Sequence, residues 1–208
     1  MKMGGELLLN VASTMARSRA NGPGIRAVVW VQGCTIGCSG CYNEFTHPHK
    51  IEALYTPDEV ANWILSIDGI DGVTFSGGEP FEQAKAVLQV IKKIKQEKQL
   101  DIFVFSGYTY AKLASSTDNN VNQLLNSIDI LSSGPYVEKS RDGSLLWRGS
   151  TNQELHYLSG KYDETMEEKW ASESPSEEFS IIDNTIHITG FGGQESDVLQ
   201  SILASMES

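Results

Sequence analysis

The stretch GVTFSGGEPFEQAKAVLQVIKKIKQEKQLDIFVFSG, residues 72–107, alternates between two hydrophobic patterns. Residues 72–77 and 101–107 are short apolar runs that end at glycine, which is typical of buried strands. Between them, residues 78–99 carry an apolar stripe at helical spacing, with lysines on the opposite face. The stripe consists of Phe81, Ala84, Val87, Leu88, Ile91 and Ile94. A strand, a helix and a strand in this order predict a βαβ unit with a parallel sheet.

The alternation continues on both sides of this stretch. RAVVWVQG (26–33) and IDILSSG (128–134) are predicted as strands. TPDEVANWILSI (56–67) is predicted as a helix, because it begins with a capping box and a proline at the first helical position. Short helices are expected at 108–116 and 121–127. The fold class is therefore α/β, with a parallel sheet that is open or curled into part of a barrel.

The chain is expected to form one domain over residues 1–208. Its core covers about residues 10–158. Residues 159–180 are rich in acidic side chains and serine, which predicts a mobile, solvated connection. Residues 181–208 are expected to form a β-hairpin, which turns at Asp183-Asn184, and a closing helix with an apolar face. That face consists of Val198, Leu199, Ile202 and Leu203.

Composition limits the possible partners and compartment. Hydrophobic residues make up 40% and charged residues 21% of the chain, as in ordinary globular proteins. A formal net charge of -11 argues against general nucleic-acid binding, which needs a basic surface. No apolar run approaches the roughly 20 residues that span a bilayer, and no signal-peptide pattern is visible. We expect a cytoplasmic protein that binds neither membrane nor nucleic acid.

VQGCTIGCSGCYN, residues 31–43, contains all three cysteines of the chain. Their clustering and odd number suit a metal or cluster site better than disulfides. A zinc site would need a fourth ligand, for which His47 is a candidate. A four-cysteine iron–sulfur site would need a ligand from elsewhere. The third interpretation, a [4Fe–4S] cluster with one open iron, is the one we favour, because an open position lets a substrate or cofactor bind metal.

Five segments together carry a family resemblance. They are GCTIGCSGCYN (33–43), NGPGIRAVVWVQGC (21–34), TFSGGEPFEQ (74–83), FSGYTYAKL (105–113) and SSGPYVEKSRDGSLLWRGSTNQ (132–153). They resemble the radical S-adenosylmethionine (SAM) enzymes, in particular the activating enzymes of glycyl-radical enzymes. The resemblance is closest to the activating component of anaerobic ribonucleotide reductase and covers about residues 10–158. It implies a partial, incomplete TIM-like βα barrel.

The resemblance also implies a cofactor site. Cys34, Cys38 and Cys41 would hold the [4Fe–4S] cluster, whose open iron would bind the amine and carboxylate of SAM. Tyr42, which follows the last cysteine, would lie against the adenine. The segment from Ser76 to Pro80 would lie beside the methionine end of SAM.

Within this segment, the backbone of Gly77 and Gly78 and the side chain of Glu79 would receive the SAM amino group. Glycine permits a close backbone approach, and a carboxylate is a suitable acceptor for a cationic amine.

Other residues have weaker assignments. Ser106 and Gly107 are candidates for the ribose hydroxyls or the methionine carboxylate, although a serine and a glycine often simply end a strand. Arg148 is a candidate for the SAM carboxylate or for the partner, and an ordinary surface ion pair is nearly as good an explanation. Residues 21–24 are expected near the mouth of the site. His47 and His49 are assigned to the loop after the cluster, in a structural role.

The implied activity is reductive cleavage of SAM to a 5′-deoxyadenosyl radical, which would abstract hydrogen from a glycine of a partner glycyl-radical enzyme such as anaerobic ribonucleotide reductase. A flavodoxin or ferredoxin would supply the electron. No acid–base pair is required beyond the cluster and SAM. One alternative is a radical SAM enzyme that acts on a small molecule or peptide. A second is a zinc- or cluster-binding interaction module without catalysis.

Overall fold

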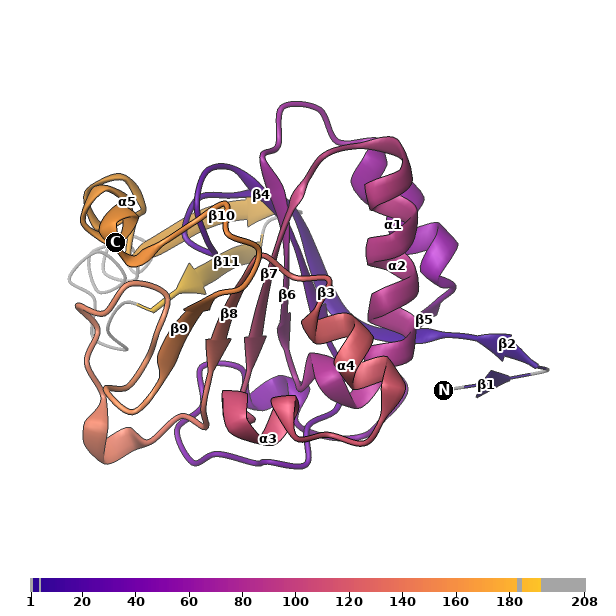
Figure 1. Cartoon of the computed structure of the whole chain (residues 1–208), viewed down its shortest axis with the longest axis horizontal. Helices are drawn as coiled ribbons and strands as arrows, with labels where there is room; N and C mark the ends of the chain where they lie inside the picture. Colours follow the sequence, from indigo (N-terminus) through magenta and orange to yellow (C-terminus); the bar gives the residue numbers. More distant parts are fainter. Residues whose placement is uncertain (1, 4, 183–184, 192–208) are drawn as a thin grey trace.

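The structure, a computed structural model, describes residues 2–3, 5–182 and 185–191 and has a mixed α/β fold (Figure 1). Its main feature is a seven-stranded sheet with the order β5-β3-β4-β6-β7-β8-β9. The four central strands β4, β6, β7 and β8 are parallel to one another, whereas β3, β5 and β9 pair antiparallel. The strands are β3 (Leu9–Ser18), β4 (Arg26–Val31), β5 (Ala53–Tyr55), β6 (Gly72–Gly77), β7 (Asp101–Ser106), β8 (Ile130–Ser133) and β9 (Glu154–Tyr157).

Four helices cover one face of this sheet and enclose the main hydrophobic core (Figure 1). They are α1 (Pro57–Leu65), α2 (Ala84–Glu97), α3 (Tyr110–Ala114) and α4 (Asn119–Leu125). α1 begins with the expected capping box, in which Thr56 and Glu59 bond each other's backbone. α2 follows β6 through the short 3-10 helix Pro80–Gln83 and packs its apolar stripe against the sheet. Among the described residues, no helix is both long and apolar enough to cross a membrane.

The opposite face of the sheet is covered by the C-terminal part of the chain. Helix α5 (Glu167–Glu173) and the hairpin of β10 (Glu177–Ile182) and β11 (Thr185–Gly190) lie on this side (Figure 1). A second apolar cluster forms here from Phe103, Ile130, Trp147 and Trp170. Buried apolar clusters therefore lie on both faces of the same sheet.

Arg26 is buried at the start of β4, on the face that the C-terminal segment covers. Its guanidinium donates to the Thr74 hydroxyl and to three carbonyl oxygens, those of Pro23, Val73 and Asp101, at 2.8–3.0 Å. Burial lowers the pKa of Arg26 to about 10, against the influence of nearby carboxylates. The side chain joins the amino ends of β4, β6 and β7.

The strands and helices expected between residues 26 and 134 are confirmed, including β6 at residues 72–77. The sequence did not reveal β3 or β9, because both carry polar residues at many positions and pair antiparallel at the flanks of the sheet. The C-terminal hairpin is confirmed. Its turn at 183–184 and the closing helix lie outside the described residues.

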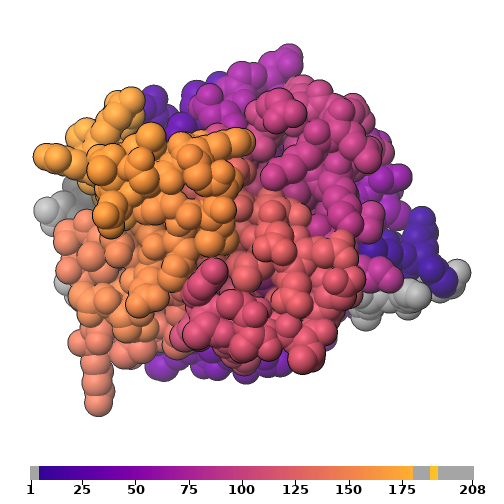
Figure 2. All heavy atoms as spheres, viewed as in Figure 1, coloured from indigo at the N-terminus to yellow at the C-terminus, as the bar shows by residue number. Residues whose placement is uncertain are grey.

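The interpretation of residues 159–180 as a mobile, solvated connection is wrong. This segment contains the 3-10 helix Glu164–Met166, helix α5 and the first part of β10. Trp170 is buried and packs against Trp147, with 5.3 Å between the ring centroids. Figure 2 shows the segment 159–180, in orange, packed against the rest of the molecule. One large aromatic side chain anchors a segment whose composition is otherwise typical of a linker.

Candidate functional site

A cleft of about 630 Å³ that is open to solvent lies at the carboxyl ends of the parallel strands. The loop after β4 contributes all three cysteines and Tyr42. The ends of β6 and β7 contribute Ser76–Glu79 and Phe105–Gly107. Carboxyl ends of parallel strands meet at one edge of a sheet, so residues far apart in sequence converge there. The cleft brings together all three cysteines, Tyr42, Ser76–Glu79 and Ser106–Gly107, whereas Arg148 and residues 21–24 lie elsewhere.

Two glycines let the loop after β6 lie against the backbone that enters the cysteine loop. Gly77 has a φ of +92°, and a Cβ on it would lie 2.7 Å from the carbonyl oxygen of Val31. A Cβ on Gly78 would lie 2.2 Å from the carbonyl oxygen of Gly33. The Gly78 N–H donates to Val31, and the Glu79 N–H donates to Gly33, at 2.8 and 2.9 Å. No larger residue fits in this contact without moving one of the two loops.

Glu79 lines the cleft, but its carboxylate serves groups of the protein itself. It accepts hydrogen bonds from the Ser106 hydroxyl at 3.0 and 3.1 Å, from the Gly107 N–H at 2.8 Å and from the Phe81 N–H at 3.0 Å. The side chain is completely buried. Burial raises its pKa to about 7, although the three donors oppose the shift. The structure thus shows Glu79 as a link between the ends of β6 and β7 rather than as a free acceptor.

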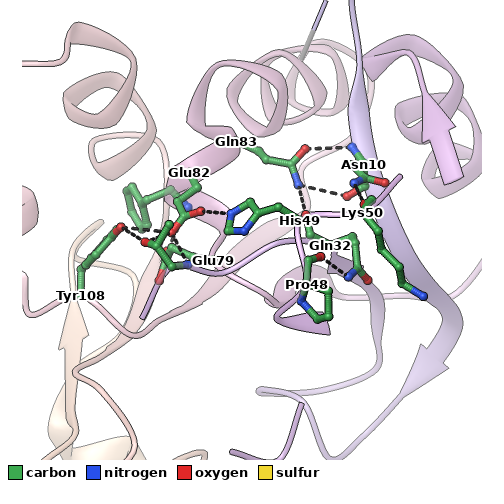
Figure 3. A network of polar contacts seen from close by, with 11 residues as sticks. Asn10, Gln32, Pro48, His49, Lys50, Glu79, Glu82, Gln83 and Tyr108 are labelled. Atoms are coloured by element: carbon green, nitrogen blue, oxygen red, sulfur yellow. Dashed lines mark hydrogen bonds and ion pairs between the residues drawn. The ribbon is translucent and has the colours of Figure 1, made fainter. Parts of the chain in front are cut away.

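A polar network that the sequence analysis missed fixes the first half of the cysteine loop (Figure 3). The Glu82 carboxylate accepts from the Thr35 N–H at 2.8 Å, from the Thr35 hydroxyl and from the Tyr108 hydroxyl at 3.2 Å. The same carboxylate lies 2.9 Å from Nε2 of His49. Thr35 directly follows Cys34, so Glu82 determines where this part of the loop lies. An acidic residue shortly after SGGEP was the only sequence signal.

The neighbouring residue Gln83 fixes the base of the same loop (Figure 3). Its amide nitrogen donates to the carbonyl oxygens of Asn10 and Gln32, and its amide oxygen accepts from the Asn10 N–H. The Gln32 side chain in turn donates to the Pro48 carbonyl oxygen at 2.6 Å. Strand β3, the end of β4 and the far end of the loop are held together in this way.

The three cysteine side chains are half-buried in the cleft wall. Burial raises the pKa of the Cys34 and Cys41 thiols, while backbone N–H groups partly oppose this. Among the described residues, no group of three or more His, Cys, Asp or Glu side chains converges on a single ion. Three thiolates that each bind a different iron of one cluster need not converge on a point. The donor set therefore fits a cluster better than a zinc site completed by His47.

Aromatic side chains in mutual contact form part of the cleft lining. Tyr42 packs edge to face against Tyr136 and Phe191, with centroid distances of 5.4 Å to each. Phe105 lies 5.5 Å from Phe191. Tyr42 was predicted from the sequence as a site residue, and the other three rings were not. Nothing in the local sequence around Phe191 indicates that it reaches the cysteine loop.

Two of the expected site positions lie away from the cleft. Arg148 does not line the cleft; it donates to the Leu146 carbonyl oxygen and pairs with Glu167, with 3.4 Å between Nη2 and Oε2. Residues 21–24 precede β4 and therefore lie at the opposite end of the strand from the cysteines. Asn21 is buried and donates from its amide to Ser18 and Thr189. Its role is to join β3 to the C-terminal hairpin.

Known proteins resemble this chain over most of its length. The sequence profile described as "4Fe-4S single cluster domain" matches residues 20–156. The anaerobic ribonucleoside-triphosphate reductase-activating protein of Vibrio cholerae is 36% identical over 143 residues, which are 65% of this chain and 90% of the relative. The protein of the same name from Escherichia coli K12 is 34% identical over 146 residues, 66% and 92% of the two chains.

A viral relative and one solved structure complete the comparison. The protein of the same name from Enterobacteria phage T4 is 34% identical over 142 residues, 65% of this chain and 85% of the relative. QueE from Escherichia coli has a TM-score of 0.41 and 14% identity over 49% of this chain and 53% of QueE, which is too weak a likeness to assign a fold. The sequence matches, together with the three cysteines in one cleft, show that this chain belongs to the family of anaerobic ribonucleoside-triphosphate reductase-activating proteins.

Proposed function

We propose that this chain activates an anaerobic ribonucleotide reductase by generating a glycyl radical on it. The observation that carries the proposal is the single cleft in which the three cysteines, the Ser76–Glu79 segment and the Ser106–Gly107 segment meet. The names of the relatives identify the partner as the reductase. Cys34, Cys38 and Cys41 would hold the [4Fe–4S] cluster.

The cluster and SAM, when bound, supply one-electron cleavage of the SAM sulfonium and a carbon radical that takes a hydrogen atom. The protein has to bind, orient and shield these groups. The Ser76–Gly78 backbone would receive the methionine end, because its glycines leave room for a close approach. Glu79 would act indirectly by keeping the Ser106–Gly107 turn in place. Tyr42 would pack against the adenine.

We also propose a finer description of the fold. The central strands β4, β6, β7 and β8 would form an incomplete, TIM-like βα barrel, and residues 1–208 would be one domain with a core at about 10–158. The parallel strand order and the cleft at the carboxyl ends support this. The protein would work in the cytoplasm, with a reductant such as flavodoxin or ferredoxin.

Anaerobic reconstitution tests the proposed function. The protein with iron, sulfide, SAM and a reductant is mixed with the glycyl-radical reductase encoded in the same genome, and the glycine-centred EPR signal is recorded. We expect the signal with the wild-type chain and its loss with Cys38→Ala. The absence of a signal while SAM is still cleaved would contradict the proposal. In that case, deuterium transfer into 5′-deoxyadenosine from candidate small molecules or peptides would identify the alternative substrate.

A further inference from the structure

Phe191 reaches the cleft from a part of the chain outside the matched family profile. The profile ends at residue 156, whereas Phe191 follows β11 at the end of the C-terminal hairpin. It nevertheless lines the same cleft as the three cysteines. A segment beyond the family's matched core therefore supplies one wall of the site.

The backbone directs Phe191 toward the cleft. Gly190 has a φ of +118°, and a Cβ on it would lie 2.2 Å from the Ser176 carbonyl oxygen. The Phe191 N–H donates to that same oxygen at 2.7 Å. The chain thus crosses the start of β10 at a point where only glycine fits, and the next side chain enters the cleft.

The hairpin that carries Phe191 is attached to the main sheet. Glu178 accepts hydrogen bonds from the Ser18 hydroxyl at 2.6 Å and from the Arg19 N–H at 3.0 Å. On β11, the Thr189 hydroxyl accepts from the Asn21 amide at 2.9 Å. Trp170, just before the hairpin, is buried in the second apolar cluster. Attachments before and within the hairpin hold Phe191 in place.

The cleft lining combines two chemically different groups of residues, and SAM has two matching portions. The first group is the thiols and the Ser76–Gly78 backbone. The second is a cluster of rings in mutual contact, those of Tyr42, Phe105, Tyr136 and Phe191. SAM carries a charged amino-acid portion and a flat purine. Stacking of a base on an aromatic side chain contributes about 1–3 kcal/mol by alanine substitution in proteins that bind single-stranded nucleic acids. The purine therefore matches the aromatic cluster.

We propose that Phe191 is a cofactor-binding residue that completes the aromatic cluster of the cleft and covers the adenosine portion of SAM. This inference rests on the proposed function. It assigns residues 159–191 the task of delivering that side chain. With Tyr42 and Phe105, Phe191 completes an apolar wall that retains SAM and keeps water out of the cleft.

The test is the dissociation constant of SAM for the reconstituted full-length chain, measured by equilibrium dialysis without reductant. We expect Phe191→Ala to raise the dissociation constant about tenfold, which corresponds to about 1.4 kcal/mol. Phe191→Trp should bind within about twofold of wild type, because it keeps an aromatic face, and Phe191→Leu should lie between the two. Ile188→Ala is the matched control, since Ile188 is on the same hairpin, 46% exposed and not part of the cleft lining.

Iron content and the thermal unfolding midpoint of each variant show whether the cluster and the fold are kept. A wild-type dissociation constant in folded, cluster-loaded Phe191→Ala would overturn this inference while leaving the proposed function intact. An equal loss of SAM affinity in Phe191→Leu, Phe191→Trp and Phe191→Ala would also overturn it. The same loss of affinity in Ile188→Ala would do so as well. A wild-type chain that does not bind SAM would overturn both proposals.

Discussion

The carboxylate of Glu79 accepts a hydrogen bond from the hydroxyl of Ser106 across a separation of 27 residues. The loop after β6 is thereby joined to the end of β7, at the floor of the cleft that the cysteines line. This pair links the two strand ends on which the proposed cofactor site depends.

The buried Glu79 makes stability depend on pH. Its pKa rises from an ordinary 4.5 to about 7 in the folded protein, chiefly through burial. The folded state then binds the proton of Glu79 more tightly than the unfolded state does. The resulting stabilisation of the folded state is fully present below pH 4.5 and is lost as pH rises through about 7. As pH rises from 4.5 to 8, we expect the free energy of unfolding of cluster-free Glu79→Gln to increase by on the order of 3 kcal/mol relative to that of the wild type. Urea unfolding at several pH values measures the difference, and a pH-independent difference would show that Glu79 does not titrate in this way.

Removing the Glu82 carboxylate should loosen the cysteine loop. Glu82→Ala leaves the Thr35 N–H and hydroxyl without their shared acceptor and frees His49. We expect iron content after reconstitution to fall at least twofold and the cluster to be lost faster during dialysis against a chelator. Glu97→Ala, at the exposed end of α2, is the control and should keep the wild-type iron content. Equal retention in both variants would contradict the role given to Glu82.

A methyl group at Gly78 should separate the two loops that form the cleft. The added carbon of Gly78→Ala would lie 2.2 Å from the backbone oxygen of Gly33, which cannot move away as a flexible side chain can. We expect loss of most SAM binding, measured by dialysis, and a reduced cluster content. Gly5→Ala adds a carbon with no atom within 4 Å, and the strain of its φ of +91° stays away from the cleft lining, so SAM binding and cluster content should not change. Normal SAM binding by Gly78→Ala would show that the contact is not needed.

Trp170 should anchor the acidic segment. Trp170→Ala removes a buried indole from the cluster with Trp147 and should lower the free energy of unfolding by about 3–5 kcal/mol. Hydrogen exchange of residues 159–182 should increase more than that of β4 and β6, because the lost contacts are local. Lys169→Ala, with a largely exposed side chain on the same helix, serves as the control. Unchanged hydrogen exchange of residues 159–182 in Trp170→Ala would contradict the anchoring role of Trp170 and favour a mobile connection.

The sequence by itself determined the elements whose cause is local. The alternation of apolar runs and helical stripes between residues 72 and 107 correctly predicted β6, α2 and β7, because burial of one face imposes a characteristic period. Cys34, Cys38 and Cys41 follow β4 and Ser76–Gly78 lie at the end of β6, and both groups line one cleft. Parallel strands place such ends at one edge whatever the remaining contacts are.

Only the tertiary structure decided which distant groups meet. It joined Glu79 to Ser106, turned Arg148 toward Glu167 and brought Phe191 to Tyr42. It also showed that β3 belongs to the main sheet, where pairing with β4 and β5 compensates for its polar residues. These outcomes depend on packing and hydrogen bonding between segments far apart in the chain, and local periodicity carries no information about such partners.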